Sequence, residues 1–325
     1  MFGASSAGHA SIETMKKHLK TFLGLALLVA TFGAFAYYLN GHRELLTQLR
    51  HIHPGILVLL LALYAVWFGA LAWVMQISLR MYRKKMGLQE NFLLSAYSNL
   101  ANFFGPGQSG PGVRAIYLKK KHNLRVKDYI FATLLYYAFY SILSAFMLMA
   151  GSRAWWQTAV VVLAAAGGSA VVLKWYARKS QIKDGDGLNP VTLIWLFTAT
   201  ALQMLAQIGI YWVEVHAVAP QASFSQALTY TGAANFALFV ALTPGAIGIR
   251  ESFLLFSQHL HHLGSNIIVS ANVIDRAVYL VFLGLLFVLV LSLHASRKFK
   301  FAQNMKADDI EDASDADELP VSDKS

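Results

Sequence analysis

Long apolar segments dominate the hydrophobic pattern of this chain. Six runs of at least seventeen residues are rich in Leu, Val, Ala and aromatic residues and almost free of charge. A run of that length matches the apolar thickness of a bilayer, so each one predicts a membrane-spanning helix. The pattern therefore predicts an all-α integral membrane protein with about six transmembrane helices. The segments are residues 21–39, 55–78, 129–150, 157–173, 191–214 and 267–294.

Two further apolar stretches, residues 91–104 and 224–240, run into sequences rich in Gly and Pro. The first is too short to span a membrane. Both predict re-entrant hairpins, because irregular backbone is tolerated in a membrane only inside protein or beside a wet cavity. The second is long enough to be a span kinked at Pro244, and this alternative stays open. The break residues are Gly105, Pro106, Gly107, Gly110 and Gly112 in the first hairpin and Pro244, Gly245 and Gly248 in the second.

The pattern repeats itself at an offset of 136 residues. Each half also contains the tripeptide Ala-Asn-Phe in its broken segment, ahead of an arginine. Matching broken segments in two halves are typical of transporters built from inverted repeats. A chance match is the alternative. The aligned pairs are residues 21–39 with 157–173, residues 55–78 with 191–214, and Arg114 with Arg250.

Clusters of Lys and Arg set the expected orientation, because they favour the cytoplasmic side of a plasma (inner) membrane. Placing every cluster on that side puts both termini in the cytoplasm. A signal peptide cut after Ala36 is an alternative, but the length of the first apolar run favours an uncleaved helix. The expected divisions are a cytoplasmic segment 1–20, a first membrane repeat 21–150, a second membrane repeat 151–300 and a disordered acidic cytoplasmic tail 301–325.

Composition narrows the classes of function. The chain has 325 residues, 56% of them hydrophobic and 14% charged, which is too apolar for an ordinary soluble domain. Its net charge of +10 comes from basic clusters beside the apolar segments, which suits anionic lipid headgroups better than nucleic acid. The chain contains no cysteine, so a disulfide or a thiolate metal site is excluded. We expect no metal and no cofactor.

Charged residues within the apolar segments are the candidate functional groups. An ionisable side chain inside a membrane costs at least a few kcal/mol, so it usually serves a function. The alternative is that these residues only neutralise one another across the bundle. Glu214 is also interpreted as a marker of the membrane interface at the end of its helix. The candidates are Arg114, Arg250, Glu251, Asp275 and Arg276.

The Gly/Pro breaks favour a binding site for an anion. A helix that starts after such a break directs its free N–H groups and positive dipole end toward an anion. The guanidinium groups of Arg114 and Arg250 add a fork that matches phosphate with two hydrogen bonds. Asn102 and Asn235, within the Ala-Asn-Phe tripeptides, are expected to cap the freed backbone.

Two stretches carry a family resemblance. Residues 102–124 resemble the first signature of the lysylphosphatidylglycerol synthase transmembrane, or flippase-like, family, and residues 243–251 are similar to the second. Arg276 in the last helix also fits. Where the family commonly has Gly-Glu followed by Arg, this chain has Gly112-Val113-Arg114, and Ala246 replaces a Gly of the second signature.

The resemblance implies the handling of anionic or polyprenyl-linked lipids in the cell envelope. Together with the residues it favours a lipid translocase, with an anionic phospholipid or a polyprenyl-phosphate-linked sugar as partner. The arginines would bind the headgroup phosphate, and Glu251 and Asp275 would position or release them. Two alternatives remain, an intramembrane lipid-modifying enzyme and an accessory subunit of a glycosyltransferase pathway. Lysyl transfer by this chain alone is not expected, because only about 30 residues follow the last span.

Overall fold

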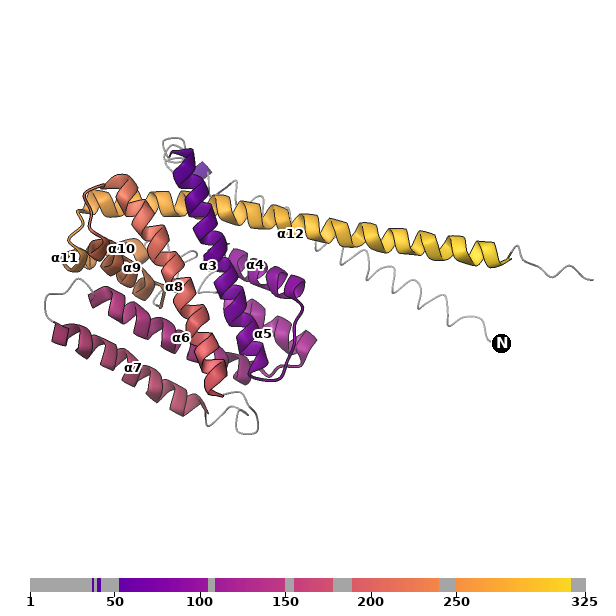
Figure 1. The fold of residues 1–325 in the computed structure, drawn as a ribbon, viewed down its shortest axis with the longest axis horizontal. Coiled ribbons are helices and arrows are strands. Elements are labelled where there is room, and N and C mark those ends of the chain that lie inside the picture. The colour runs from indigo at the N-terminus through magenta and orange to yellow at the C-terminus, as the bar shows by residue number, and fades with distance from the viewer. Residues whose placement is uncertain are drawn as a thin grey trace, which may run out of the picture.

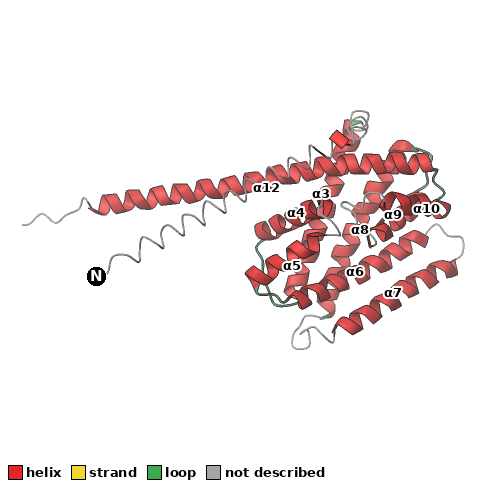
Figure 2. Ribbon diagram, turned by 180° about the vertical axis from the view of Figure 1, so that it is seen from behind, coloured by secondary structure: helices red, strands yellow, loops and turns green. Residues whose placement is uncertain are grey.

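The computed structural model is built from helices, and no strand occurs in the residues it describes (Figure 2). Those residues are 37, 40–41, 53–104, 109–149, 155–177, 189–239 and 249–316. The helices are α3 (Pro54–Arg80), α4 (Leu88–Phe104), α5 (Ser109–His122), α6 (Val126–Met149), α7 (Trp155–Ala177), α8 (Pro190–Val218), α9 (Phe224–Phe239), α10 (Ile249–Phe256), α11 (Gln258–His261) and α12 (Ser265–Ala316) (Figure 1).

Five of these helices are long and apolar enough to cross a membrane: α3, α6, α7, α8 and residues 265–293 of α12. They coincide with five of the six spans predicted from the apolar pattern. The sixth, residues 21–39, lies outside the described residues. The chain is therefore an all-α integral membrane protein, as the sequence predicts.

The helices α3 and α8 begin in the same way, at positions 136 residues apart. Each has a proline in its first turn, where the missing N–H costs nothing. The preceding side chain caps each helix: the N–H of Gly55 donates to His53 Nδ1 at 3.1 Å, and that of Val191 donates to Asn189 Oδ1 at 2.7 Å. The shared start supports the alignment of the two segments.

The two helices also run antiparallel along each other through the centre of the bundle (Figure 1). Trp73, near the end of α3, meets Trp195, near the start of α8, with ring centroids 5.7 Å apart. Farther along, Gly209 of α8 lies against Leu63 of α3. Inverted repeats require equivalent helices to run in opposite directions. The two-repeat arrangement of the whole chain stays a prediction, because the counterpart of α7 lies outside the described residues.

The shorter helices fold back on themselves. The helix α4 packs on α5, and α9 packs on α10 and α11. The two groups lie on opposite sides of the body in both views (Figures 1 and 2). Such packing is what re-entrant hairpins predict, and for the second one it favours the hairpin over a kinked span.

The helix α9 is buried in the bundle. Ala233, Ala234 and Ala237 are fully inaccessible. Gly232 touches α6 so closely that a Cβ would overlap the backbone N of Leu148. Small residues allow helix backbones to approach in this way inside a membrane.

The last helix corrects one expectation. The sequence predicts a disordered tail from residue 301, whereas α12 continues to Ala316 and extends far beyond the body (Figure 1). No Gly or Pro interrupts residues 285–319, and Lys, Ala, Gln, Met and Glu are good helix formers. The low apolar content that indicated disorder does not prevent the helix of the last span from continuing.

Candidate functional site

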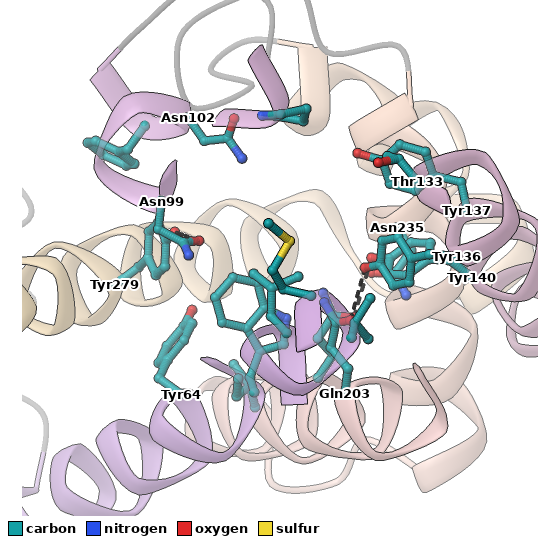
Figure 3. A pocket seen from close by; sticks show the side chains of 18 of the residues that line it. Tyr64, Asn99, Asn102, Thr133, Tyr136, Tyr137, Tyr140, Gln203, Asn235 and Tyr279 are labelled. Atoms are coloured by element: carbon teal, nitrogen blue, oxygen red, sulfur yellow. Dashed lines mark hydrogen bonds between the residues drawn. The ribbon is translucent and has the colours of Figure 1, made fainter. Parts of the chain in front are cut away.

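A cavity of about 240 Å³ that contains several charged and polar side chains lies between the two hairpins and the long helices. Asn99 and Asn102 of α4 border one side, and Thr133 and Tyr136 of α6 the facing side (Figure 3). The cavity brings together six of the seven binding residues predicted from the sequence, although they come from five helices. These six are Asn102, Arg114, Asn235, Arg250, Asp275 and Arg276.

The Arg250 side chain is held by an ion pair between the second hairpin and the last helix. Its Nη1 contacts Asp275 Oδ2, and both side chains are 6% exposed. Tyr64 Oη of α3 donates a hydrogen bond to the other oxygen of Asp275 at 2.5 Å. The ring of Tyr211 lies 5.1 Å from the guanidinium, within the range of a cation–π contact. Three helices therefore fix the position of Arg250.

The seventh predicted residue, Glu251, lies beside the cavity. Arg276 Nη2 approaches Glu251 Oε1 at 3.2 Å, and Asn272 Nδ2 donates to the same oxygen at 2.6 Å. Adjacent residues on a helix point about 100° apart. For this reason Arg250 and Glu251 reach different partners on α12, Asp275 and Arg276 respectively. The hypothesis that these four charges neutralise one another is confirmed as two cross-helix pairs.

The Arg114 guanidinium differs from the other two that line the cavity. It forms no ion pair with any residue that the structure describes, and its Nε is buried without a hydrogen-bond partner among those residues. The side chain points into the cavity from the second turn of α5. Arg250 and Arg276 each pair with a carboxylate, whereas no described carboxylate neutralises the charge of Arg114.

Close contact between α4 and α5 positions Arg114. The N–H of Gly110 donates to Asn102 Oδ1 at 2.7 Å, and Ser109 Oγ donates to the Ala101 carbonyl at 2.5 Å. A Cβ on Gly110 would lie only 2.5 Å from the carbonyl oxygen of Ser98, so glycine is required there. Asn102 therefore caps the start of α5, as the sequence predicts.

The other predicted hairpin residues divide into two groups. Asn235 is fully buried, and its Nδ2 contacts Met204 Sδ at 3.4 Å, so its capping role stays a prediction. Gly112 is exposed and has open space where a Cβ would lie. The remaining break residues lie outside the described part of the chain: Gly105, Pro106, Gly107, Pro244, Gly245 and Gly248.

Comparison with known proteins agrees with this picture. The model of the family described as the lysylphosphatidylglycerol synthase TM region matches residues 21–287. The chain belongs to this family. The match covers every residue that lines the cavity and confirms the resemblance seen in the two signatures. No curated protein and no solved structure matches the chain.

In this lysylphosphatidylglycerol synthase TM region, uncharged polar side chains of α6 and α8 also line the cavity, and the sequence did not single them out. Tyr136 Oη donates to Gln203 Oε1 at 2.9 Å, and Tyr140 Oη donates to Gln207 Oε1 at 3.3 Å. The two tyrosines on α6 and the two glutamines on α8 are each spaced four residues apart, on one helix face. That spacing of polar groups within apolar spans was the signal in the sequence.

A second basic region lies outside the cavity, at the far end of α5. Glu90 Oε1 accepts hydrogen bonds there from Tyr117 Oη at 2.8 Å and lies 2.7 Å from His122 Nε2 and 3.0 Å from Lys121 Nζ. Partial burial alone would raise the pKa of Glu90, but the bonds from His122, Tyr117 and Lys121 lower it to about 2. This cluster links α4 to α5, and none of its residues lines the cavity.

Proposed function

We propose that this protein moves an anionic lipid between the leaflets of the membrane, with Arg114 binding the phosphate of the headgroup. The observation that carries the proposal is the position of Arg114. Its guanidinium lines the cavity between the hairpins and has no carboxylate partner among the described residues. A phosphate would supply the missing negative charge and accept two hydrogen bonds from the guanidinium fork.

The charges around the cavity support a monoanionic or dianionic headgroup. The pairs Arg250–Asp275 and Arg276–Glu251 are each neutral, so Arg114 determines the charge of the binding space. Arg250 keeps Nε and Nη2 without hydrogen-bond partners among the described residues. Because both atoms are buried, they would bind phosphate oxygens only after the Arg250 side chain shifts. The acyl or prenyl chains would stay in the surrounding lipid.

The arrangement favours transport over catalysis. Asp275 is the carboxylate that lines the cavity, and it already accepts hydrogen bonds from Tyr64 and Arg250. A general base needs an oxygen that is available to the proton it removes. Because both oxygens of Asp275 already accept a hydrogen bond, one of them from a guanidinium, Asp275 is a weak base here, and the cavity is better suited to binding a headgroup than to altering it.

Reconstitution of the full chain in vesicles tests the proposal. Phosphatidylglycerol and a polyprenyl-phosphate sugar, each with a fluorescent tail, are supplied separately, and loss of fluorescence to an external quencher reports the exposed leaflet. We expect Arg114→Ala to weaken headgroup binding by about 3 kcal/mol, which corresponds to a loss of roughly a hundredfold. Arg114→Lys keeps the charge without the fork and should recover only part of the activity.

The matched control is Lys119→Ala, which removes an exposed cation from the same helix. It should leave transport unchanged. Mass spectrometry of the recovered lipid distinguishes the two functions, because a translocase returns its substrate chemically unaltered. A covalently changed headgroup, formed by the wild type and lost in Arg114→Ala, would support the enzyme instead. Equal transport by the wild type and Arg114→Ala would refute phosphate binding at this residue.

A further inference from the structure

Glu214 is a buried carboxylate that the proposed transport site does not use. It lies on α8, one turn beyond the cavity-lining Tyr211, and is only 1% exposed. Neither of its oxygens accepts a hydrogen bond from a described donor, and the polar group within bonding range is another carboxylate, that of Asp275. Its burial contrasts with His216 and Ala217, which follow on the same helix and are exposed. The interpretation of Glu214 as an interfacial marker stays a prediction. Buried polar groups are almost always hydrogen-bonded, so this one requires an explanation.

The surroundings of Glu214 contain more negative than positive charge. Asp275 is its strongest electrostatic neighbour, followed by Arg250. Arg250 already pairs with Asp275, and the nearby Arg276 pairs with Glu251. An ionised Glu214 would thus place a second carboxylate beside a single guanidinium. The titratable groups that interact electrostatically with it are Tyr211 on its own helix and, on the neighbouring helices, Tyr64 of α3, Tyr230 of α9, Arg250 of α10 and Asp275 of α12.

Two buried carboxylates that share one cation do not both ionise readily, because their like charges repel. Asp275 has two hydrogen-bond donors, Tyr64 and Arg250, whereas Glu214 has none among the described residues. The proton therefore belongs on Glu214 in this arrangement. Ionisable groups held inside a membrane in this way commonly belong to proton pathways.

We propose that Glu214 is a proton-binding site that couples proton movement to the movement of the lipid. Proton release would transfer the hydrogen of the Glu214 carboxyl to a water molecule and leave a carboxylate on α8. That carboxylate would attract the Nε and Nη2 donors of Arg250, which have no hydrogen-bond partner among the described residues. Arg250 would then shift from Asp275 toward Glu214 and release the headgroup. The coupling rests on the proposed transport function, whereas the proton site itself does not.

Infrared spectroscopy of the full chain in lipid tests the proton site directly. A protonated carboxylic acid has a C=O stretching band that a carboxylate lacks. We expect such a band in the wild type at neutral pH, lost in Glu214→Gln and retained, at a shifted position, in Glu214→Asp. Glu90→Gln is the matched control, because the hydrogen bonds to Glu90 keep its pKa at about 2 and hence keep it ionised. An identical band in the wild type and Glu214→Gln would refute the proton site.

Vesicles with a pH difference across the membrane test the coupling. The probe is tail-labelled phosphatidylglycerol in vesicles of phosphatidylethanolamine and phosphatidylglycerol. One pH unit should change the wild-type rate by up to about tenfold if one proton accompanies each lipid. Glu214→Gln should lose this dependence, whereas Glu90→Gln should keep it.

The outcomes separate the two proposals. Wild-type transport that ignores the gradient, or a Glu214→Gln variant that still responds to it, would refute the coupling and leave the transport function standing. If the wild type moves no labelled lipid, the transport function fails for that lipid and the coupling fails with it. The infrared band then decides the proton site independently.

Discussion

The buried ion pair between Arg250 and Asp275 allows the loss of stability on removing either partner to be predicted. Both side chains are 6% exposed, so neither charge is solvated if its partner is removed. Breaking a buried pair by removing one partner typically costs 3–5 kcal/mol, because it leaves the other charge uncompensated. We therefore expect Asp275→Asn and Arg250→Gln each to destabilise the protein by about 3–5 kcal/mol.

The double variant should be much milder than the sum of the two single variants. It removes both charges at once, and replacing a whole buried pair by neutral groups is often close to neutral. We expect a coupling energy of roughly 2–3 kcal/mol between the two positions, within the range for residues in direct contact. Tyr64 can still donate its hydrogen bond to the asparagine side-chain oxygen, so that contact does not obscure the result.

Thermal unfolding of the purified protein, followed by tryptophan fluorescence, measures the four forms. At roughly 2 °C per kcal/mol for a chain of this size, each single variant should lower Tm by several degrees. The double variant should recover roughly 2–3 kcal/mol of the combined loss. Strictly additive losses, or single variants as stable as the wild type, would refute the view that this pair is buried and mutually dependent.

Three further predictions follow from other parts of the structure. Glu251→Gln should tighten headgroup binding several-fold and slow release, because it frees Arg276 from its ion pair, and equilibrium binding of labelled lipid to the variant measures this. Glu90→Gln should lower the free energy of unfolding by up to about 1 kcal/mol at neutral pH. The pKa of Glu90 is about 2 in the folded protein and higher in the unfolded chain. The difference in stability from the wild type should therefore shrink as the pH falls from 4.5 toward 2, which thermal melts at stepped pH measure. A cysteine introduced at the exposed Gln221 should react with an impermeant reagent from outside, and one at Asp309 only from inside, since the chain has no native thiol; outward labelling at Asp309 would contradict the predicted orientation.

The sequence predicts the helices well because their signals are local. The expected starts at residues 55 and 191 differ by one residue from Pro54 and Pro190, and the cap residues His53 and Asn189 account for both starts. The length of an apolar run and the position of a proline act within a few residues of chain. The expectation for the tail was wrong because composition alone does not show that a helix continues from a span.

The sequence predicts which charges matter but not how they pair. Whether Arg250 pairs with Asp275 or with another acid depends on how one helix is rotated relative to the other. A local sequence pattern does not determine that rotation. The burial of Glu214 has the same origin, because α9 and α12 pack against α8. Neutral residues such as Gln203 were missed because a single amide in an apolar span is common.

The difference between the two hairpins has a chemical consequence that links sequence and function. In the second hairpin, Arg250 is followed by Glu251, and two acids are available for the two arginines near α10 and α12. In the first hairpin, Arg114 is followed by Ala115, and the Gly-Glu common in the family is replaced by Gly-Val. Arg114 has no carboxylate partner among the described residues, and it lies in a cavity whose other arginines are paired with acids. Under the proposed function, this unpaired guanidinium is the group that an external phosphate would bind, because no described acid competes for it.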